Sequence, residues 1–152
     1  MHASPLLSQP TKALRVLLVE NDAMIVMALS DVLAEMGYDV CATEVTEAGA
    51  VAAAVRCKPD VMIVDAILDD GSGIVAVEQI LCSGFIPHVF ISGDISRVQA
   101  CRPGAVALQK PFREPDLVRA LQHALGVRPS VRPRQSTIAR TPAKAHRQTP
   151  TE

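Results

Sequence analysis

Four positions that are far apart in the sequence carry side chains suited to phosphoryl-group chemistry. Each ends or directly follows a short apolar run, and they are Glu20-Asn21, Asp65, Ser92 and Lys110. An aspartate such as Asp65 can attack a phosphoryl group and form an acyl phosphate. Oxygen atoms from the acids and the amide can hold Mg²⁺, which neutralises the charge of two approaching anions. A hydroxyl and an ammonium group can bind the phosphoryl oxygens.

The alternation of apolar runs and helical patterns between residues 14 and 125 explains how these positions could meet. Strands are expected at 15–19, 38–42, 61–64, 88–91 and 105–108, and helices at 23–36, 46–58, 74–81, 96–101 and 115–125, with the LDDGSG segment 68–73 as a loop. Five apolar strands alternating with helices indicate an α/β fold with a doubly wound, five-stranded parallel sheet. In the common strand order 2-1-3-4-5, strands 1, 3, 4 and 5 end at the four positions, at one edge of the sheet.

Each position taken alone also has a purely structural explanation. An acid after a strand is often a helix cap, and Ser92-Gly93 and Lys110-Pro111-Phe112 are typical of turns. Pro111 is also a candidate for a cis peptide bond, since about 5–6% of X-Pro bonds are cis. The occurrence of all four at the ends of the correct strands favours one shared site over four separate turns.

As a set, these motifs resemble the receiver domain of two-component response regulators. The resemblance covers residues 14–125 and rests on VLLVEND, PDVMIVD followed by GSG, HVFISG and QKPF. It implies the flavodoxin-like receiver fold. It also implies that Asp65 accepts a phosphoryl group from a histidine kinase or a phosphotransfer protein. Ser92 and Lys110 would coordinate this group and convey its presence to the face formed by helix 4, strand 5 and helix 5.

The same resemblance implies a Mg²⁺ site formed by Glu20, Asn21, Asp65 and the backbone carbonyl of Ile67. Asn21 stands where the family usually has a second acid, so we expect weaker metal binding or less repulsion in the unphosphorylated site. Asp22 could replace the missing acid, although its position at the start of a helix favours a capping role. The apolar side chain of Ile67 cannot orient a water molecule over the acceptor, so we expect slow autodephosphorylation.

The route by which a signal leaves the site also departs from the family pattern. Ala107 stands where the family usually has a Tyr or a Phe. The segment from Ser92 to Lys110 is about four residues shorter than usual, roughly one helical turn, so a shortened fourth helix is expected. Together with Phe90, this combination is similar to the single-domain receivers of the alphaproteobacterial "FAT GUY" type, some of which serve general stress signalling.

The leading hypothesis is a single-domain response regulator, monomeric or weakly dimeric, that signals by binding an unidentified target protein. We expect no enzymatic activity beyond phosphoryl transfer to Asp65 and autodephosphorylation. The alternative is a degenerate receiver that binds its partners regardless of phosphate, which Asn21 and Ala107 favour. A metal-dependent phosphatase has less support, because Ile67 occupies the second acidic position of its Asp-x-Asp motif.

Charge divides the 152-residue chain into two parts. Residues 1–125 carry 9 basic and 15 acidic side chains, whereas residues 126–152 carry 6 and 1. The second part is rich in Pro, Ser and Thr, so we expect a disordered basic tail at 126–152 and a flexible segment at 1–13. No nucleic-acid-binding motif accompanies the tail, so nucleic acid is not expected as a partner, although a DNA-associated role for the tail stays open.

Composition indicates a globular protein, with 49% hydrophobic and 20% charged residues. No apolar run reaches the roughly 20 residues that span a bilayer, and residues 1–14 lack the pattern of a secretory signal. We therefore expect a cytoplasmic location and no membrane contact. The cysteines are widely spaced and are expected to be reduced and packed, without disulfide or zinc: Cys41, Cys57, Cys82 and Cys101.

Overall fold

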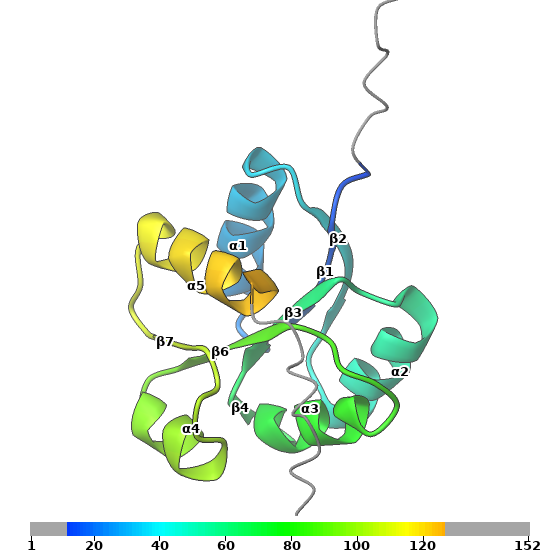
Figure 1. Cartoon of the computed structure of the whole chain (residues 1–152), viewed down its shortest axis with the longest axis vertical. Coiled ribbons are helices and arrows are strands. Elements are labelled where there is room, and N and C mark those ends of the chain that lie inside the picture. Colours follow the sequence, from blue (N-terminus) through cyan, green and yellow to red (C-terminus); the bar gives the residue numbers. More distant parts are fainter. Residues whose placement is uncertain (1–11, 127–152) are drawn as a thin grey trace, which may run out of the picture.

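In the computed structural model, which describes residues 12–126, the chain forms a parallel sheet with helices on both faces (Figure 1). The five strands of this sheet are β1 (Arg15–Val19), β2 (Asp39–Glu44), β3 (Val61–Asp65), β6 (His88–Ser92) and β7 (Ala107–Gln109). They lie in the order β2-β1-β3-β6-β7, and every neighbouring pair is parallel. This is the predicted order 2-1-3-4-5, so the predicted fold class is confirmed.

Four helices connect these strands, a fifth follows the last strand, and all five cover the sheet. They are α1 (Ala23–Glu35), α2 (Glu47–Cys57), α3 (Gly73–Leu81), α4 (Ile95–Cys101) and α5 (Glu114–Gly126). Helices α1 and α5 cover one face, and α2, α3 and α4 cover the other (Figure 1). Helix α4 has seven residues and is the shortest of the five, which agrees with the short fourth helix expected. The terminal segments predicted at 1–13 and 126–152 lie outside the described residues, apart from residues 12, 13 and 126.

The sheet separates two apolar clusters. Successive strand residues point to opposite faces, so the strands feed both clusters in alternation. Leu17, Met62 and Phe90 pack towards α2, α3 and α4, whereas Leu18, Ile63 and Ile91 pack towards α1 and α5. Strands β3 and β6 are buried along their whole length, and their polar residues lie at their ends: His88 at the start of β6, and Asp65 and Ser92 at the carboxyl ends. Burial on both faces explains why these strands read as continuous apolar runs.

Most expected element boundaries shift by no more than two residues, and two differences from the prediction have a clear structural cause. The segment 68–73, predicted as a loop, contains part of a small antiparallel hairpin between β4 (Ile67–Leu68) and β5 (Gly71–Ser72). Leu68 anchors this hairpin because its side chain is buried in the core. The last strand begins at residue 107 and not at residue 105, because the turn at 102–105 ends with the amide of Ala105 bonded to the carbonyl of Arg102.

Side-chain caps fix the starts of the helices near the carboxyl edge of the sheet. The carboxylate of Asp22 accepts hydrogen bonds from the backbone N–H groups of Met24, at 2.9 Å, and Ile25, at 3.3 Å. The capping role favoured for Asp22 is therefore confirmed. Thr46, Ser72 and Asp94 cap α2, α3 and α4 in the same manner.

The cysteines are only partly as predicted. All four thiols are free, but Cys82 and Cys101 are exposed at the ends of helices α3 and α4 and are not packed in the core. Cys82 directly follows α3 and Cys101 is the last residue of α4, and the buried faces of both helices are formed by other residues, which the spacing of cysteines alone could not reveal. Among residues 12–126, no helix combines the length and the apolar character that crossing a membrane requires.

Candidate functional site

Three of the four predicted positions meet through direct side-chain contacts at the carboxyl edge of the sheet. Glu20 follows β1, Asp65 ends β3 and Lys110 follows β7. The ammonium of Lys110 lies 2.8 Å from Asp65 Oδ2 and 3.1 Å from Glu20 Oε2. A side chain 45 residues away from Asp65 in sequence therefore bridges two carboxylates from neighbouring strands. The strand order places β1 and β3 side by side, which brings the two carboxylates together, and Lys110 reaches them from the end of β7, beyond β6.

The two carboxylates of this site are almost completely shielded from solvent. Glu20 is 1% exposed and Asp65 is 6% exposed. Burial raises the pKa of Glu20 above its ordinary value, and the negative charge of Asp65 adds to that effect. Hydrogen bonds from the Asp22 amide and from Lys110 act in the opposite direction. The site therefore holds two like charges close together, and one lysine balances them only in part.

Lys110 stays firmly protonated in this environment. Partial burial alone would lower the pKa of its ammonium group. Hydrogen bonds and charge attraction from Asp65 and Glu20 outweigh that effect and raise the pKa above its ordinary value. The lysine can therefore act as a permanent positive charge beside Asp65.

The loop that carries Asp65 is held by its own backbone and by the start of α3. The N–H of Ile67 donates to Asp65 Oδ1 at 3.0 Å, and the N–H of Gly73 donates to the Ala66 carbonyl at 3.0 Å. A Cβ atom at Gly73 would lie 1.8 Å from the backbone oxygen of Asp65, so only glycine permits this close approach. The sequence motif GSG contains this glycine, but the spacing alone did not show what it contacts.

Ser92 lies at the same edge, but its hydroxyl contacts a different partner. Its backbone carbonyl accepts from the N–H of Lys110 at 2.8 Å, which fixes β6 beside the lysine. Its hydroxyl donates to the Asp94 carbonyl at 3.0 Å and accepts from the Asp94 N–H at 3.1 Å. The residue is 2% exposed. The hydroxyl thus lies at the end of β6, the strand that pairs with β3, and is engaged with the start of α4.

The oxygen donors at this edge fit a hard divalent cation such as Mg²⁺. Glu20 and Asp65 supply two adjacent carboxylates whose repulsion a cation would relieve, and Asn21 and the Ile67 carbonyl would add neutral oxygens. Thiol and imidazole ligands, which zinc prefers, are not part of this set. Within residues 12–126, no group of three His, Cys, Asp or Glu side chains is placed to hold a metal ion.

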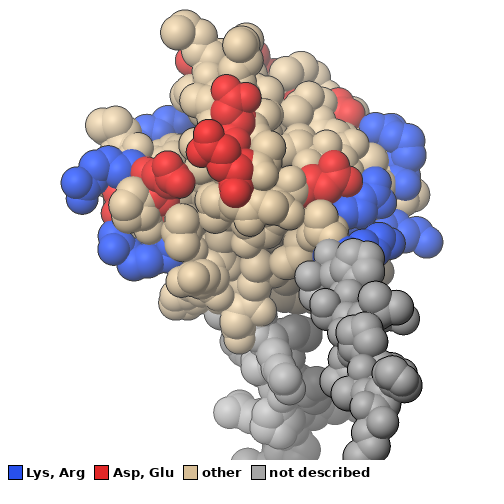
Figure 2. All heavy atoms as spheres, turned by 90° about the horizontal axis from the view of Figure 1, so that it is seen from above, with Lys and Arg blue, Asp and Glu red and all other residues tan. Residues whose placement is uncertain are grey.

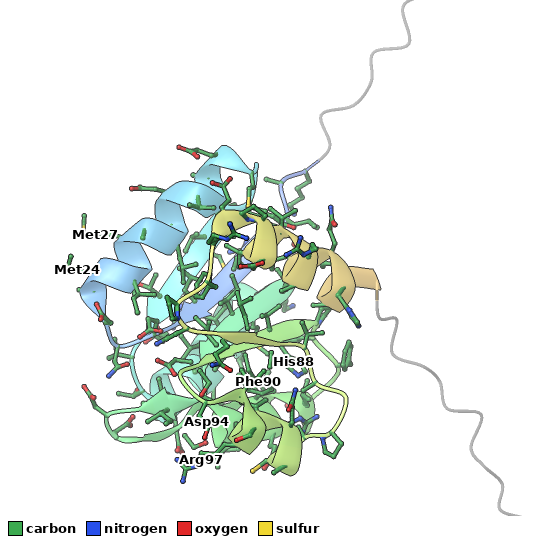
Figure 3. All side chains as sticks on the ribbon, turned by 90° about the vertical axis from the view of Figure 1, so that its left-hand side faces the viewer. Met24, Met27, His88, Phe90, Asp94 and Arg97 are labelled. Carbon is green, nitrogen blue, oxygen red and sulfur yellow. The ribbon has the colours of Figure 1, made fainter. Side chains whose placement is uncertain are left out.

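The surroundings of Ala107 show where the aromatic side chain of this region lies. Ala107 pairs with Phe90 across β6 and β7, and Phe90 is completely buried. The ring of His88 meets the ring of Phe90 edge to face, with centroids 5.3 Å apart (Figure 3). Burial lowers the pKa of His88, and its Nδ1 hydrogen-bonds with the Ile86 carbonyl at 2.8 Å. The aromatic group is therefore a fixed core element on β6.

Comparison with known proteins identifies the class of this fold and site. Residues 16–122 match the response regulator receiver domain, and the chain therefore belongs to this family. It is 37% identical over 119 residues to the transcriptional regulatory protein PdtaR of Mycobacterium tuberculosis, covering 73% of this chain and 56% of PdtaR. The chain thus spans little more than half the length of that relative. It is also 27% identical over 112 residues to the chemotaxis protein CheY of Thermotoga maritima, covering 93% of CheY.

Solved structures give the same result for the fold. The receiver domain of the PhyR response regulator from Erythrobacter litoralis superposes with a TM-score of 0.71 at 33% identity, covering 78% of this chain and 94% of that domain. The response regulator PhyR from Brucella abortus superposes with a TM-score of 0.67 at 32% identity, covering 75% of this chain and 48% of that protein. The resemblance to PhyR-type receivers is thus shown, whereas the assignment to the "FAT GUY" type stays a prediction.

Proposed function

We propose that this receiver accepts a phosphoryl group on Asp65 from a histidine kinase or a phosphotransfer protein, and that it signals by binding another protein. The observation that carries this proposal is the lysine bridge, with Lys110 at 2.8 Å from Asp65 and 3.1 Å from Glu20 at the carboxyl edge of the sheet. A cation held against a shielded carboxylate is the arrangement that transfer of an anionic group to an aspartate requires.

The contacts of Asp65 support a separate role for each neighbouring group. Oδ1 is oriented by the Ile67 N–H and Oδ2 by Lys110, so the carboxylate presents a fixed face for attack. After transfer, Lys110 would bind a phosphoryl oxygen, and Ser92 would turn its hydroxyl from Asp94 towards another. Mg²⁺, held by Glu20, Asn21, Asp65 and the Ile67 carbonyl, would neutralise the charge that accumulates as the two anions approach.

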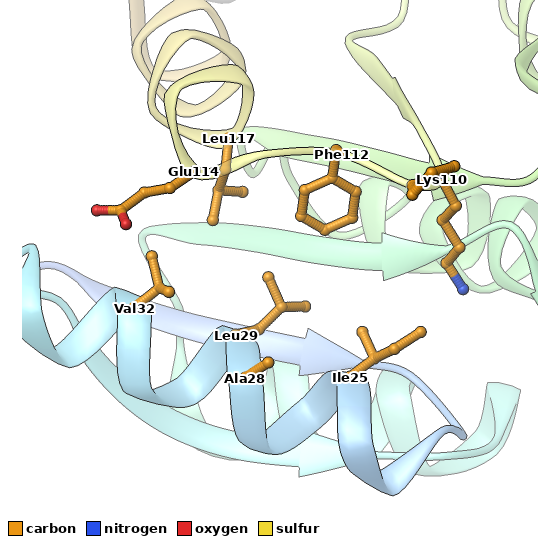
Figure 4. Close-up of a pocket in the computed structure, with 9 residues that line it drawn as sticks. Ile25, Ala28, Leu29, Val32, Lys110, Phe112, Glu114 and Leu117 are labelled. Atoms are coloured by element: carbon orange, nitrogen blue, oxygen red, sulfur yellow. The ribbon is translucent and has the colours of Figure 1, made fainter.

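An apolar surface next to this site suits a protein as the phosphodonor. Met24 and Met27 project from α1 into solvent, with 81% and 68% of their surface exposed (Figure 3). The same helix also forms one wall of a groove of about 480 Å³ between α1 and α5, with Leu29 and Phe112 among its walls and Lys110 at one end (Figure 4). Flexible methionine side chains adapt to a partner surface at low cost. A donor protein seated there would have its reactive group close to Asp65.

The charge distribution on the visible upper face does not favour a nucleic acid as the partner. In Figure 2, Lys and Arg lie in separate groups at the sides, with acidic side chains between them. Binding to a phosphate backbone uses a continuous basic surface, which this face of the described residues does not present. The basic segment predicted at 126–152 lies outside the described residues.

Labelling with acetyl phosphate tests the proposed function directly. The wild-type protein is expected to form an acid-stable, base-labile phosphoprotein in the presence of Mg²⁺, and Asp65→Ala is expected to abolish the label. Asp70→Ala is the matched control, because it removes an exposed carboxylate from the adjacent hairpin. Absence of label on the wild type, or retention of label on Asp65→Ala, would overturn the proposal.

A phosphorylation-independent adaptor is the second candidate, and two observations favour it. Asn21 leaves the metal site one charge short, and Ala107 replaces the aromatic group that receivers of this family usually move. A pull-down that compares phosphorylated protein with Asp65→Asn separates the two candidates. Equal capture of a partner by both proteins supports the adaptor, whereas capture that depends on phosphate supports the regulator.

A further inference from the structure

The first residue of α2 reaches across to the hairpin that follows the acceptor. Glu47 Oε1 accepts a hydrogen bond from the backbone N–H of Ser72 at 2.5 Å. The two residues are 25 positions apart in the sequence: Glu47 precedes β3, the strand that ends at Asp65, and Ser72 follows it. The contact lies in a half-buried position, where a charge-assisted hydrogen bond is less screened by water than on an open surface.

Gly71 makes room for this contact. A Cβ atom at position 71 would lie 2.0 Å from Glu47 Oε1 and 2.7 Å from Glu47 Cδ. The carboxylate therefore rests directly on the backbone of β5, and any larger residue at this position would push it away. The glycine and the glutamate form one clamp that holds β5 against the start of α2.

The clamp is connected to the acceptor by two further links. Ser72, whose N–H the clamp holds, pairs with Ile67 across the hairpin. Ile67 in turn donates its N–H to Asp65 Oδ1 at 3.0 Å. The hydroxyl of Ser72 also caps α3, accepting from the N–H of Ile74 at 3.1 Å. A shift of Ser72 would thus move the donor that orients the acceptor carboxylate.

We propose that Glu47 is a positioning residue for the acceptor loop. It holds β5, and through β5 it keeps the Ile67 N–H and carbonyl in the place that phosphorylation of Asp65 requires. This role rests on the proposed function. It differs from a general stabilising role of an acid in the first turn of α2, where the negative charge alone would favour the helix N-terminus.

The pair of variants Glu47→Ala and Glu47→Gln separates these two roles. Glutamine keeps an oxygen that can accept from Ser72 but loses the charge, so a positioning role predicts rescue by Glu47→Gln. A role for the charge alone predicts that Glu47→Gln behaves as Glu47→Ala does. Glu78→Ala is the control, because it removes a carboxylate from α3 that pairs with Arg102 at 3.9 Å and not with the hairpin.

Two measurements test the role of Glu47, and one of them does not require phosphorylation. Amide hydrogen exchange in the unphosphorylated protein is expected to be about tenfold faster at Ser72 and Ile67 in Glu47→Ala, since one charged hydrogen bond is lost. Labelling by acetyl phosphate is expected to slow about tenfold in the same variant. Glu78→Ala should stay within about twofold of the wild type in both measurements, and Glu47→Gln, which keeps a neutral hydrogen bond of about half the strength, within about threefold.

The outcomes separate this inference from the proposed function. If the wild type is labelled and Glu47→Ala is labelled equally fast, only the positioning role is overturned. Equal impairment of Glu47→Gln and Glu47→Ala also overturns it, in favour of the helix charge. An unlabelled wild type overturns the proposed function and this role together. Faster exchange at Ser72 with slower labelling in Glu47→Ala, rescued by Glu47→Gln, supports the role.

Discussion

Lys110 holds two buried carboxylates together, so its replacement by methionine tests the electrostatics of the site. Its Nζ lies 2.8 Å from Asp65 Oδ2 and 3.1 Å from Glu20 Oε2. At an effective dielectric constant of about 20, each contact has a Coulomb energy of about 5–6 kcal/mol before desolvation is subtracted. Lys110→Met leaves both carboxylates without their partner, so we expect the free energy of unfolding at pH 7 to fall by about 3 kcal/mol.

Protonation of Glu20 limits this loss and makes it depend on pH. Burial and the charge of Asp65 already raise the pKa of Glu20, and loss of the Lys110 hydrogen bond would raise it further. For a carboxylate with the ordinary pKa of 4.5, protonation costs about 3.4 kcal/mol at pH 7 but only about 0.7 kcal/mol at pH 5. These values are the most that the loss of Lys110 can cost through Glu20, because Glu20 can take up a proton instead. A carboxyl group with a raised pKa favours the folded state below its unfolded pKa, and this contribution is lost as the pH rises. The variant should therefore be most destabilised at neutral pH.

Urea unfolding followed by circular dichroism at pH 7 and pH 5 measures both quantities. Arg119→Met is the control, because it removes an exposed ion pair with Asp116 and should cost little at either pH. The electrostatic reasoning is refuted if Lys110→Met loses the same free energy at both pH values. It is also refuted if the loss is no larger than that of the control.

Three further substitutions test other parts of the site. Asn21→Asp is expected to tighten Mg²⁺ binding in a calorimetric titration, because it adds a third carboxylate beside Glu20 and Asp65; an unchanged affinity would contradict this. Ile67→Asn is expected to shorten the lifetime of the phosphorylated protein, because the asparagine amide can orient a water molecule. Equal rates of label loss from the wild type and the variant would contradict this. Gly73→Ala is expected to lower the free energy of unfolding by about 1–3 kcal/mol, because its Cβ would lie 1.8 Å from the Asp65 carbonyl oxygen. An unchanged urea midpoint would contradict this close packing.

The sequence predicted the sheet and the edge at which the site lies, because both follow from local patterns. The strands at 61–65 and 88–92 are buried on both faces, so their apolar runs are unbroken until a polar residue ends them. Asp65 and Ser92 are those residues. Lys110 lies close to Asp65 because the parallel strands β3 and β7 end at the same edge of the sheet. This proximity follows from the topology and not from the distance in sequence.

The parts that the sequence did not predict depend on contacts between distant side chains. Glu47 lies at the start of α2, where an acid is ordinary, so nothing in the pattern indicated its bond to Ser72. Gly71 and Gly73 belong to a short motif typical of a turn, and their roles became visible only when the atoms facing them were known. Each strand of the β4–β5 hairpin has only two residues, which is too short for an alternating apolar and polar pattern to be visible in the sequence.

The hydroxyl of Ser92 could respond to phosphorylation of Asp65 in a chain that has no aromatic residue on β7. A serine hydroxyl has one proton, and Ser92 donates it to the carbonyl of Asp94. A phosphoryl oxygen on Asp65 could accept this proton only if the bond to Asp94 were broken. The side chain of Asp94 caps α4 by accepting from the Ser96 N–H at 3.0 Å, so that change would act directly on the start of α4. Because α4 has only seven residues, it has few internal hydrogen bonds to resist such a change. If Asp65 is phosphorylated as proposed, a short fourth helix coupled to Ser92 through Asp94 would give the signal a route to the surface that does not pass through Ala107.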